Sequence, residues 1–490
     1  MEKIVESGED YKIVKKNSRY YYVLNIPELS RDEKLFLEEV RRKAITDIRI
    51  DPYAVRDEHA RRKLLIKEIL ELINQEEWRW ELKEIPLKLD EDKKQQIANI
   101  IVDHMIGYGY LDPLIKNDNL EEIMVLGVGP PVYVYHRKYG MCESNIIFER
   151  ESEIKVIIEK IARLVGRRID ISVPLLDARL PDGSRVNATL PPVTLDGPTI
   201  TIRKFKKEPY TIIDLINFNT LSSEIASFLW VATEGLGRKP ANILIAGGTG
   251  SGKTTTLNCL AIFIPERQRI ITIEDTAELQ LPLKHKIRME TRPPNVEGKG
   301  EITMDMLLKN TLRMRPDRII VGEVRGEEAK TLFTAMNTGH EGCLGTLHAN
   351  SAKETITRLV NPPMNVPRIM IPALDLIVVQ NRYYTKGGLI RRVNEIAEVY
   401  SEGGRIKIDN IYEWNPAKDS FKKSKKESII IKEISRFSGV PPDEILEEIE
   451  NRKKLLEYLR NNNIRELTKV HAWIQGYYEE KEKILNKIST

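Results

Sequence analysis

Cysteine is scarce in this sequence. Three cysteines occur among 490 residues, Cys142, Cys259 and Cys343, and they are far apart along the chain. Three separated thiols do not make a disulfide framework, and no CxxC pair indicates a zinc or redox site. We therefore expect reduced structural thiols, a cytoplasmic setting and no bound zinc.

Long hydrophobic runs are also missing. The most apolar stretch, residues 369–379, is interrupted by Pro372 and Asp375. A membrane-spanning helix needs roughly 20 consecutive, mostly apolar residues. The first residues, MEKIVESGEDYKIVKK, are charged and lack the apolar core of a signal peptide. The sequence thus predicts a chain that is neither secreted nor embedded in a membrane.

Neither sign of charge dominates. There are 77 lysines and arginines against 73 aspartates and glutamates, which gives a formal net charge of +4, and aromatic residues make up 7%. This balance gives no whole-chain case for nucleic acid as an obligate partner, although a local basic groove stays open. The 41% apolar and 31% charged residues are typical of a folded globular protein, and the length favours two to four domains.

The periodicity changes along the chain. Residues 151–165 have the pattern of an amphipathic helix, and residues 167–205 favour strands joined by turns. Apolar strands then alternate with helical stretches, which predicts a parallel sheet wound by helices. The tail from Pro441 carries two helical patterns. The expected domains are a variable region at 1–95, an α+β domain at 96–237, an α/β domain with this parallel sheet at 238–400 and a mainly helical extension at 401–490.

The strongest motif is GGTGSGKT at residues 247–254. It fits GxxxxGK[ST], follows the apolar strand 242–246 and opens a helical run. Backbone N–H groups of such a loop and the helix N-terminus hold a polyphosphate, which predicts ATP with Mg²⁺. Lys253 should reach the β- and γ-phosphates, and Thr254 should ligate the magnesium. The predicted nucleotide-binding residues are Gly247, Gly248, Thr249, Gly250, Ser251, Gly252, Lys253, Thr254 and Thr255.

Two strands end in acidic residues. Strand 318–321 leads into Gly322 and Glu323, and Glu323 is the candidate that polarises the attacking water. A generic Walker B motif would have aspartate where Gly322 stands. The strand ending at Ile273 leads into Glu274 and Asp275, which should lie at the same sheet edge. With Thr254, these two acids are the predicted magnesium-binding groups, and Glu274 is also a catalytic candidate.

Two histidines follow in TGHEGCLGTLHAN, residues 338–350. His340 and His348 suggest a loop that senses the γ-phosphate or positions water. They are eight residues apart, and no third metal ligand accompanies them, so a zinc site is not expected.

Together, GGTGSGKTT, ITIEDTAELQL, LRMRPDRIIVGEVRG and TGHEGCLGTLHAN resemble the Walker A, Asp, Walker B and His boxes of the type II/type IV secretion ATPase superfamily. Glycine before Glu323 fits that family. HRKYG at 136–140 and the tail past 401 are most similar to its archaeal branch, the archaellar motor ATPase and archaeal pilus-assembly ATPases. The resemblance covers roughly residues 96–400.

The resemblance implies an α/β fold in which an α+β N-terminal domain precedes a RecA-like P-loop NTPase domain and a helical C-terminal extension. It further implies a homo-hexamer at the inner face of the cell membrane, working with a polytopic platform protein and filament machinery. Arginines of the N-terminal domain would reach the γ-phosphate, since a guanidinium neutralises phosphoryl charge. The candidates are Arg179, Arg185 and Arg203, and the sequence does not choose between them.

Two other classes of function stay open. One is a DNA-translocating or conjugation-type ATPase, and the other is a nucleotide-gated scaffold without turnover. Within the main interpretation, archaellum rotation and pilus assembly, and extension and retraction, are not distinguished. The roles of residues 1–95 and of the C-terminal extension also stay open.

Overall fold

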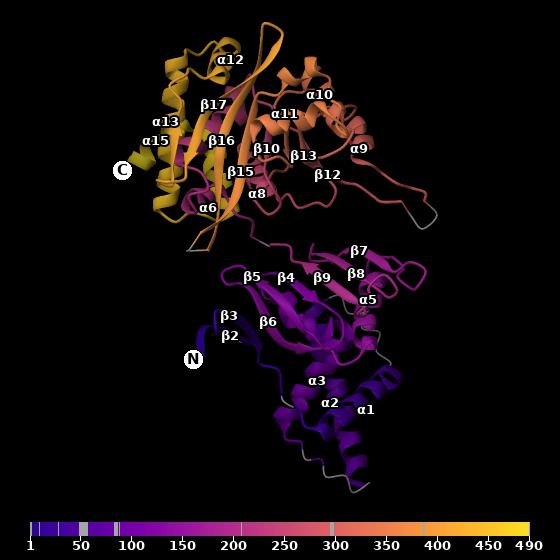
Figure 1. Cartoon of the computed structure of the whole chain (residues 1–490). Coiled ribbons are helices and arrows are strands. Elements are labelled where there is room, and N and C mark those ends of the chain that lie inside the picture. Colours follow the sequence, from indigo (N-terminus) through magenta and orange to yellow (C-terminus); the bar gives the residue numbers. More distant parts are fainter. Residues whose placement is uncertain are drawn as a thin grey trace. The chain divides into compact units, whose positions relative to one another are not determined.

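The computed structural model describes residues 2–489, except 9, 28, 49–56, 83–86, 88, 207, 295–297 and 386–387. The chain divides into two compact units, Met1–Lys207 and Glu208–Thr490, which are drawn in Figure 1. In the described part of the chain, no helix is both long enough and apolar enough to cross a bilayer.

The first unit is built on a mixed sheet whose described strands run in the order β1-β2-β3-β6-β5-β4-β9-β8-β7. Only β3 and β6 pair in parallel among them, and the other neighbours are antiparallel. The strands are β1 (Lys3–Ser7), β2 (Tyr11–Lys16), β3 (Arg19–Leu24), β4 (Leu120–Val125), β5 (Pro131–His136), β6 (Gly140–Ile147), β7 (Leu175–Arg179), β8 (Arg185–Thr189) and β9 (Thr199–Arg203).

Helices cover one face of that sheet and form a separate small core. The apolar face of α5 packs on alternate residues of the strands, as its period predicts. Helices α1, α2 and α3 enclose a second cluster around Phe36 and Trp80. The helices are α1 (Arg31–Asp47), α2 (Glu58–Leu82), α3 (Glu91–Ile106), α4 (Asp112–Lys116) and α5 (Glu151–Leu164).

The second unit contains a sheet in the order β12-β11-β13-β14-β10-β15-β16-β17-β18. The strands from β12 to β15 are parallel, and β16 to β18 continue the sheet antiparallel. The strands are β10 (Ile243–Ala246), β11 (Ile270–Glu274), β12 (Lys286–Glu290), β13 (Arg318–Val324), β14 (Leu344–Leu347), β15 (Leu376–Thr385), β16 (Gly388–Glu402), β17 (Arg405–Asn415) and β18 (Ser420–Lys423).

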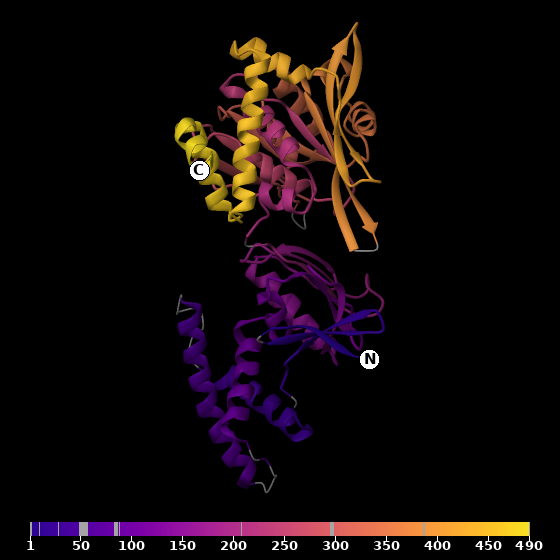
Figure 2. The same ribbon diagram turned by 90° about the vertical axis from the view of Figure 1, so that its left-hand side faces the viewer.

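Each face of this sheet buries its own apolar core. Helices α6, α7, α8 and α12 to α14 share one core, and α9, α10 and α11 share the other. Figure 2 shows the C-terminal helices, in yellow, on the first of these faces. The helices are α6 (Ile212–Asn217), α7 (Ser223–Glu234), α8 (Lys253–Ala261), α9 (Met304–Thr311), α10 (Glu328–Asn337), α11 (Ala352–Val360), α12 (Ile429–Ser438), α13 (Pro442–Asn461), α14 (Leu467–Glu479) and α15 (Lys481–Ser489).

The units divide elsewhere than the sequence pattern suggests. The division falls at Lys207, not at 237, because the apolar residues of α6 and α7 pack against α8 in the second unit. The region 1–95 is not set apart either, since β3 pairs with β6 in the first sheet. The extension past 401 continues as β17 and β18 and becomes helical from Ile429.

Candidate active site

The loop of residues 247–252 joins β10 to α8 at the carboxyl edge of the parallel sheet. Gly252 precedes the helix with φ +95°, a conformation that a side chain rarely adopts. At Gly247 an added Cβ would lie 2.1 Å from the backbone oxygen of Gln380. These two glycines therefore let the loop curl close to β15 and turn its N–H groups inward, as a phosphate-binding loop requires.

Lys253 begins α8 and turns back over the loop. Its side chain is buried, and its Nζ donates a hydrogen bond to the Gly248 oxygen at 3.0 Å. Burial lowers the pKa of this amine, and the nearby Glu323 carboxylate opposes that shift. Thr254 and Thr255 follow in the first turn of the helix, both half-buried. The lysine is thus held in the loop where the phosphates of a nucleotide would lie.

A residue outside every motif fixes the loop. Gln380, buried at the point where β15 passes the loop, donates from Nε2 to the Ser251 oxygen at 2.7 Å. Its Oε1 accepts from the Thr256 hydroxyl at 2.6 Å. Sequence reasoning missed Gln380, because no spacing rule links it to residues 247–254. The available signal was its place one residue after the apolar run Leu376–Val379.

Glu323 and His348 face each other beside the loop. Glu323 lies near the end of β13, and His348 directly follows β14, the strand between β13 and β10. The His348 Nε2 is 3.1 Å from the Glu323 carboxylate. Burial and Lys253 lower the pKa of His348, while Glu323 raises it. The net shift favours a neutral imidazole beside the carboxylate.

Glu274 ends β11, the strand next to β13. Its side chain is buried, which raises the pKa of the carboxyl group. One carboxylate oxygen accepts backbone hydrogen bonds from Glu278 at 2.7 Å and Leu279 at 3.0 Å. In the described part of the chain the other oxygen has no hydrogen-bond partner. Glu274 therefore fixes the following turn and keeps one acceptor available.

Asp275 points to a different set of groups. One of its oxygens accepts from the Thr291 hydroxyl at 3.0 Å, and the other is ion-paired with Arg325. Both oxygens of Asp275 are therefore engaged in this structure.

The two histidines are not brought together. His348 follows the carboxyl end of β14, but His340 precedes the amino end of that strand, so the strand separates them. The backbone N–H of His340 donates to the Ala335 oxygen at 3.1 Å, at the end of α10. The expectation of one phosphate-sensing loop is corrected, because within its own chain His340 lies at the sheet edge opposite the P-loop.

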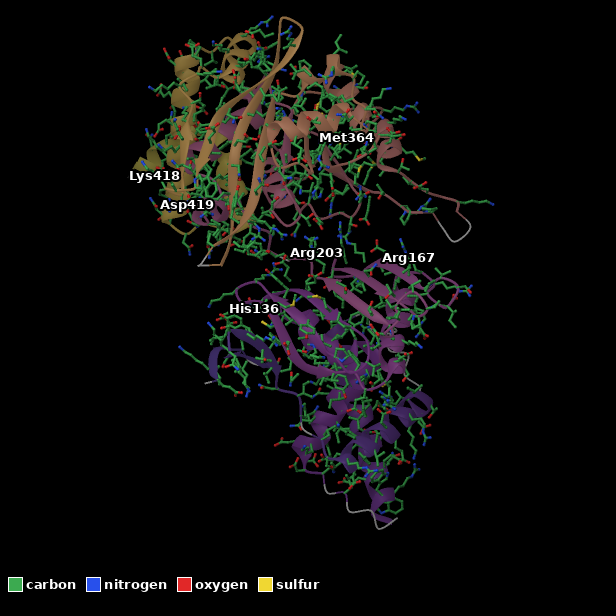
Figure 3. All side chains as sticks on the ribbon, viewed as in Figure 1. His136, Arg167, Arg203, Met364, Lys418 and Asp419 are labelled. Carbon is green, nitrogen blue, oxygen red and sulfur yellow. The ribbon has the colours of Figure 1, made fainter. Side chains whose placement is uncertain are left out.

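The three candidate arginines lie side by side in the first unit. Arg179 pairs with Arg185 across β7 and β8, and Arg185 pairs with Arg203 across β8 and β9. Directly paired residues project from the same face, so the three guanidinium groups form one row. The core residues Ala178, Val186 and Ile202 occupy the other face. Arg203, labelled in Figure 3, is exposed.

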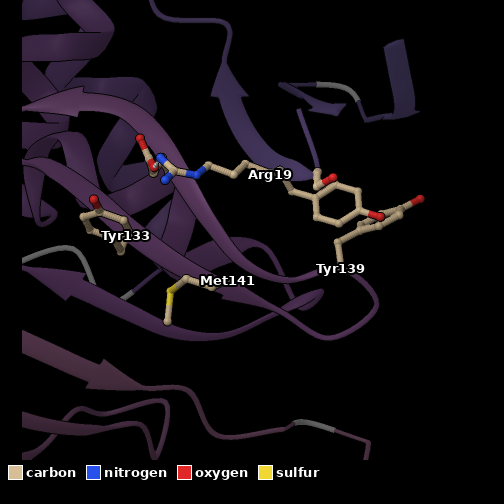
Figure 4. A pocket seen from close by; sticks show the side chains of 7 residues that line it. Arg19, Tyr133, Tyr139 and Met141 are labelled. Atoms are coloured by element: carbon tan, nitrogen blue, oxygen red, sulfur yellow. Dashed lines mark ion pairs between the residues drawn. The ribbon is translucent and has the colours of Figure 1, made fainter. Parts of the chain in front are cut away.

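A pocket lies on the first unit at β3, β5 and β6. Arg19, Tyr133, Tyr139 and Met141 are among its lining residues (Figure 4). Arg19 is ion-paired with Glu143 at 3.7 Å across it. None of these residues belongs to a predicted motif for phosphate binding.

Comparison with known proteins places this arrangement in a family. A family model described as type II/IV secretion system protein matches residues 107–471. An uncharacterised protein of Methanocaldococcus jannaschii is 38% identical, over 78% of this chain and 76% of its own length. A putative conjugal transfer protein of Mycobacterium tuberculosis is 35% identical, over 54% of this chain and 75% of its own.

Two solved structures are similar to this chain at lower sequence identity. The VirB11 ATPase of the Brucella suis type IV secretion system is 27% identical with a TM-score of 0.31, over 59% of this chain and 96% of that chain. The pilus retraction motor PilT with bound ADP is 22% identical with a TM-score of 0.41, over 68% and 88%. The family model covers most of the chain and all four boxes. This chain therefore belongs to the type II/IV secretion system protein family, whose members are ATPases.

Proposed function

We propose that this chain is a cytoplasmic, hexameric ATPase at the inner face of the cell membrane that powers an archaeal type IV-like surface filament through a polytopic platform protein. The observation that carries the ATPase part of this proposal is the contact of 3.1 Å between Glu323 and His348 beside the P-loop lysine. A carboxylate in this position is placed to take up or orient the proton of an attacking water.

The neighbours of Glu323 keep it suited to that task. His348 in its neutral form lies 3.1 Å from the carboxylate without supplying a second full positive charge. Lys253 remains the cation that a γ-phosphate would meet, and its Coulomb interaction with Glu323 favours the charged form of the lysine amine. His348 thus borders the carboxylate, while the lysine is available to the phosphates.

Magnesium fits the same sheet edge. Magnesium in P-loop sites uses one or two protein oxygens besides phosphates and water. The required chemistry is offered by the Thr254 hydroxyl and by the buried Glu274 oxygen that has no hydrogen-bond partner among the described residues. Asp275 is tied to Arg325 and Thr291, so we assign it to a supporting position. When bound, the ion would offset the charge on the phosphate oxygens.

The row of Arg179, Arg185 and Arg203 suggests what the first unit contributes to ATP hydrolysis. The row gathers the positive charge of these three arginines on one face of the sheet. Guanidinium groups suit the oxygens of a γ-phosphate, with which they form charge-assisted hydrogen bonds. We assign Arg203 the leading role, because it is the exposed member of the row. A ring of six copies would let such groups complete each site.

The filament assignment rests on relatives rather than on geometry. The M. jannaschii relative, which aligns over most of this chain, supports the archaeal branch. A second candidate is a conjugation-type ATPase, favoured by relatives described as conjugal transfer proteins in Mycobacterium tuberculosis and Rhizobium radiobacter. The two differ in whether the ring handles DNA.

The test replaces the native gene with the Glu323→Gln form and counts surface filaments by electron microscopy. We expect loss of one filament type, with the wild-type gene restoring it. In parallel, single-stranded DNA is titrated into the ATPase assay, and the rate should not change. Normal filaments in the mutant would contradict the filament role, and DNA-stimulated hydrolysis would favour the conjugation-type function.

A further inference from the structure

The hairpin of β15 and β16 extends beyond the sheet edge that holds the P-loop. β10 pairs with β15 up to Ala246 and Val379, whereas β15 and β16 remain paired as far as Thr385 and Gly388. Figure 1 shows the two strands continuing past the end of β10. We call residues 380–385 and 388–393 the arm. Its described part borders the loop on the side away from β14.

One face of the arm is turned to the P-loop. Gln380, Arg382 and Tyr384 alternate along β15 and so share a face, and their partners on β16 are Val393, Arg391 and Leu389. Gln380 binds the Ser251 oxygen. Arg391 donates from Nε to the Gly250 oxygen at 3.0 Å, and a guanidinium nitrogen of Arg382 lies 3.0 Å from where a Cβ on Gly250 would be.

Two arginines and an exposed tyrosine share this face. Arg382 and Arg391 are directly opposed, an arrangement that costs stability. Neither forms an ion pair with an acid among the described residues. Beyond them Tyr384 is 79% exposed, although it is a large aromatic side chain. Two guanidinium planes and a phenol ring in one row are suited to a flat aromatic ligand that carries negative charge.

The strand order says which end of a nucleotide would reach them. Glu323 on β13 and His348 after β14 lie on one side of β10, so the reacting γ-phosphate points to that side. β15 lies on the other side of β10. A nucleotide held in the P-loop by its phosphates therefore directs its nucleoside towards the arm.

We infer that Arg382, Arg391 and Tyr384 bind the adenosine end of the nucleotide within the same subunit, Arg382 and Tyr384 by stacking on the base and Arg391 by placing positive charge near the α-phosphate. Arg391 also positions the loop through the Gly250 carbonyl. The inference rests on the proposed binding of ATP at residues 247–254 and goes beyond it, because it assigns residues from outside every motif to nucleoside recognition.

The test compares ADP with pyrophosphate, which carries the phosphates alone. The variants are Arg382→Gln and Tyr384→Ser in the full chain, with Mg²⁺ present. The control is Arg405→Gln, an exposed arginine at the β16–β17 turn, at the opposite sheet edge. Calorimetry gives the Kd of ADP, and competition against ADP gives that of pyrophosphate. Thermal unfolding checks that each variant is folded.

We expect each arm variant to weaken ADP about tenfold, the order of one lost base-stacking contact. The Kd of pyrophosphate should stay within about twofold of the wild-type value, and the control variant should change the Kd of neither ligand. Equal losses for both ligands, or no loss for ADP, would overturn the inference. If the wild-type chain binds neither ligand, the ATP site itself is wrong, which separates that failure from failure of the arm alone.

Arg391→Gln is informative as a fourth variant. Because its Nε holds the Gly250 carbonyl, its loss should weaken pyrophosphate as well as ADP, with the larger effect on ADP. A loss confined to pyrophosphate would contradict a role for Arg391 in binding the nucleoside.

Discussion

Gly322 and Glu274 are in contact across two neighbouring parallel strands: a Cβ added to Gly322 would lie 2.9 Å from Cγ of Glu274. The buried Glu274 side chain therefore occupies the space that a side chain at 322 would need. This contact explains why glycine stands before Glu323, where a generic Walker B motif has aspartate. The close packing of β11 on β13 at this point therefore requires glycine at position 322.

Replacing Gly322 by alanine should therefore destabilise the second unit. Glu274 has little freedom to move, because its carboxylate binds the backbone N–H groups of Glu278 and Leu279. Overpacking of this kind costs about 1–3 kcal/mol of unfolding free energy. Denaturant unfolding measures it. The loss should be less than additive with Glu274→Ala, and strict additivity would show that the two side chains do not conflict.

The activity should depend on the protonation of His348. Its pKa lies below the usual 6.5, mainly through burial, so the neutral form persists into mildly acidic solution. Protonation would add a full charge beside Glu323 and weaken that carboxylate as a base. We expect a steady rate from pH 8 to about 6.5 and a fall below it.

In His348→Gln, that fall should move to lower pH, and the plateau rate should drop. The pH–rate profiles of both proteins test this. The lowered pKa of His348 also makes the unfolding free energy depend on pH. Since the unfolded chain binds the proton more readily, unfolding free energy falls as pH drops through 6.5. An identical acid limb in both proteins would exclude His348 as its source.

The arginine row should matter for turnover more than for folding. Arg203→Gln removes a like charge opposite Arg185 but also the cation opposite Glu122, so the unfolding free energy should change by less than about 1 kcal/mol. The kcat for ATP should fall about a hundredfold, because a group that offsets transition-state charge is lost. ADP affinity should change little. The exposed Arg167→Gln is the matched control, and a normal kcat for Arg203→Gln would remove that arginine from the site.

The C-terminal helices are anchored by a buried arginine. Arg452 of α13 is ion-paired with Glu234 of α7 at 2.9 Å and with Glu448 at 2.9 Å, and its guanidinium lies 5.0 Å from the Trp230 ring. Removing one partner of a buried ion pair costs about 3–5 kcal/mol.

Arg452→Ala should therefore lower the unfolding free energy by about that amount. Lys453, the next residue in α13, is less buried, so Lys453→Ala should change the unfolding free energy by less than about 1 kcal/mol. Chemical denaturation compares the two. Equal effects would show that α13 packs on α7 without help from Arg452.

The sequence predicted the parts of the site that recur at fixed spacing. The P-loop follows β10, Glu274 ends β11 and Glu323 lies near the end of β13, and strand ends in a parallel sheet meet at one edge. His340 is grouped with His348 in the sequence because both lie in one glycine-containing segment, and that spacing does not show that a strand, β14, separates them.

Other features depend on pairing between distant segments. Gln380 and Arg391 act on the loop only because β15 lies beside β10. The division at Lys207 depends likewise on α7 packing against residues of α13 that are far away in sequence. No local pattern carries such information, so these residues emerge from the fold.

The most direct test of the central claim is steady-state ATP hydrolysis by the wild type and Glu323→Gln, each over a series of protein concentrations with light scattering to follow size. The account predicts that the wild-type hydrolysis rate per subunit rises as a hexamer forms. It also predicts that the mutant still binds ATP but hydrolyses it at least about a hundredfold more slowly. Unchanged hydrolysis by Glu323→Gln, or full activity in a monomer, would contradict it.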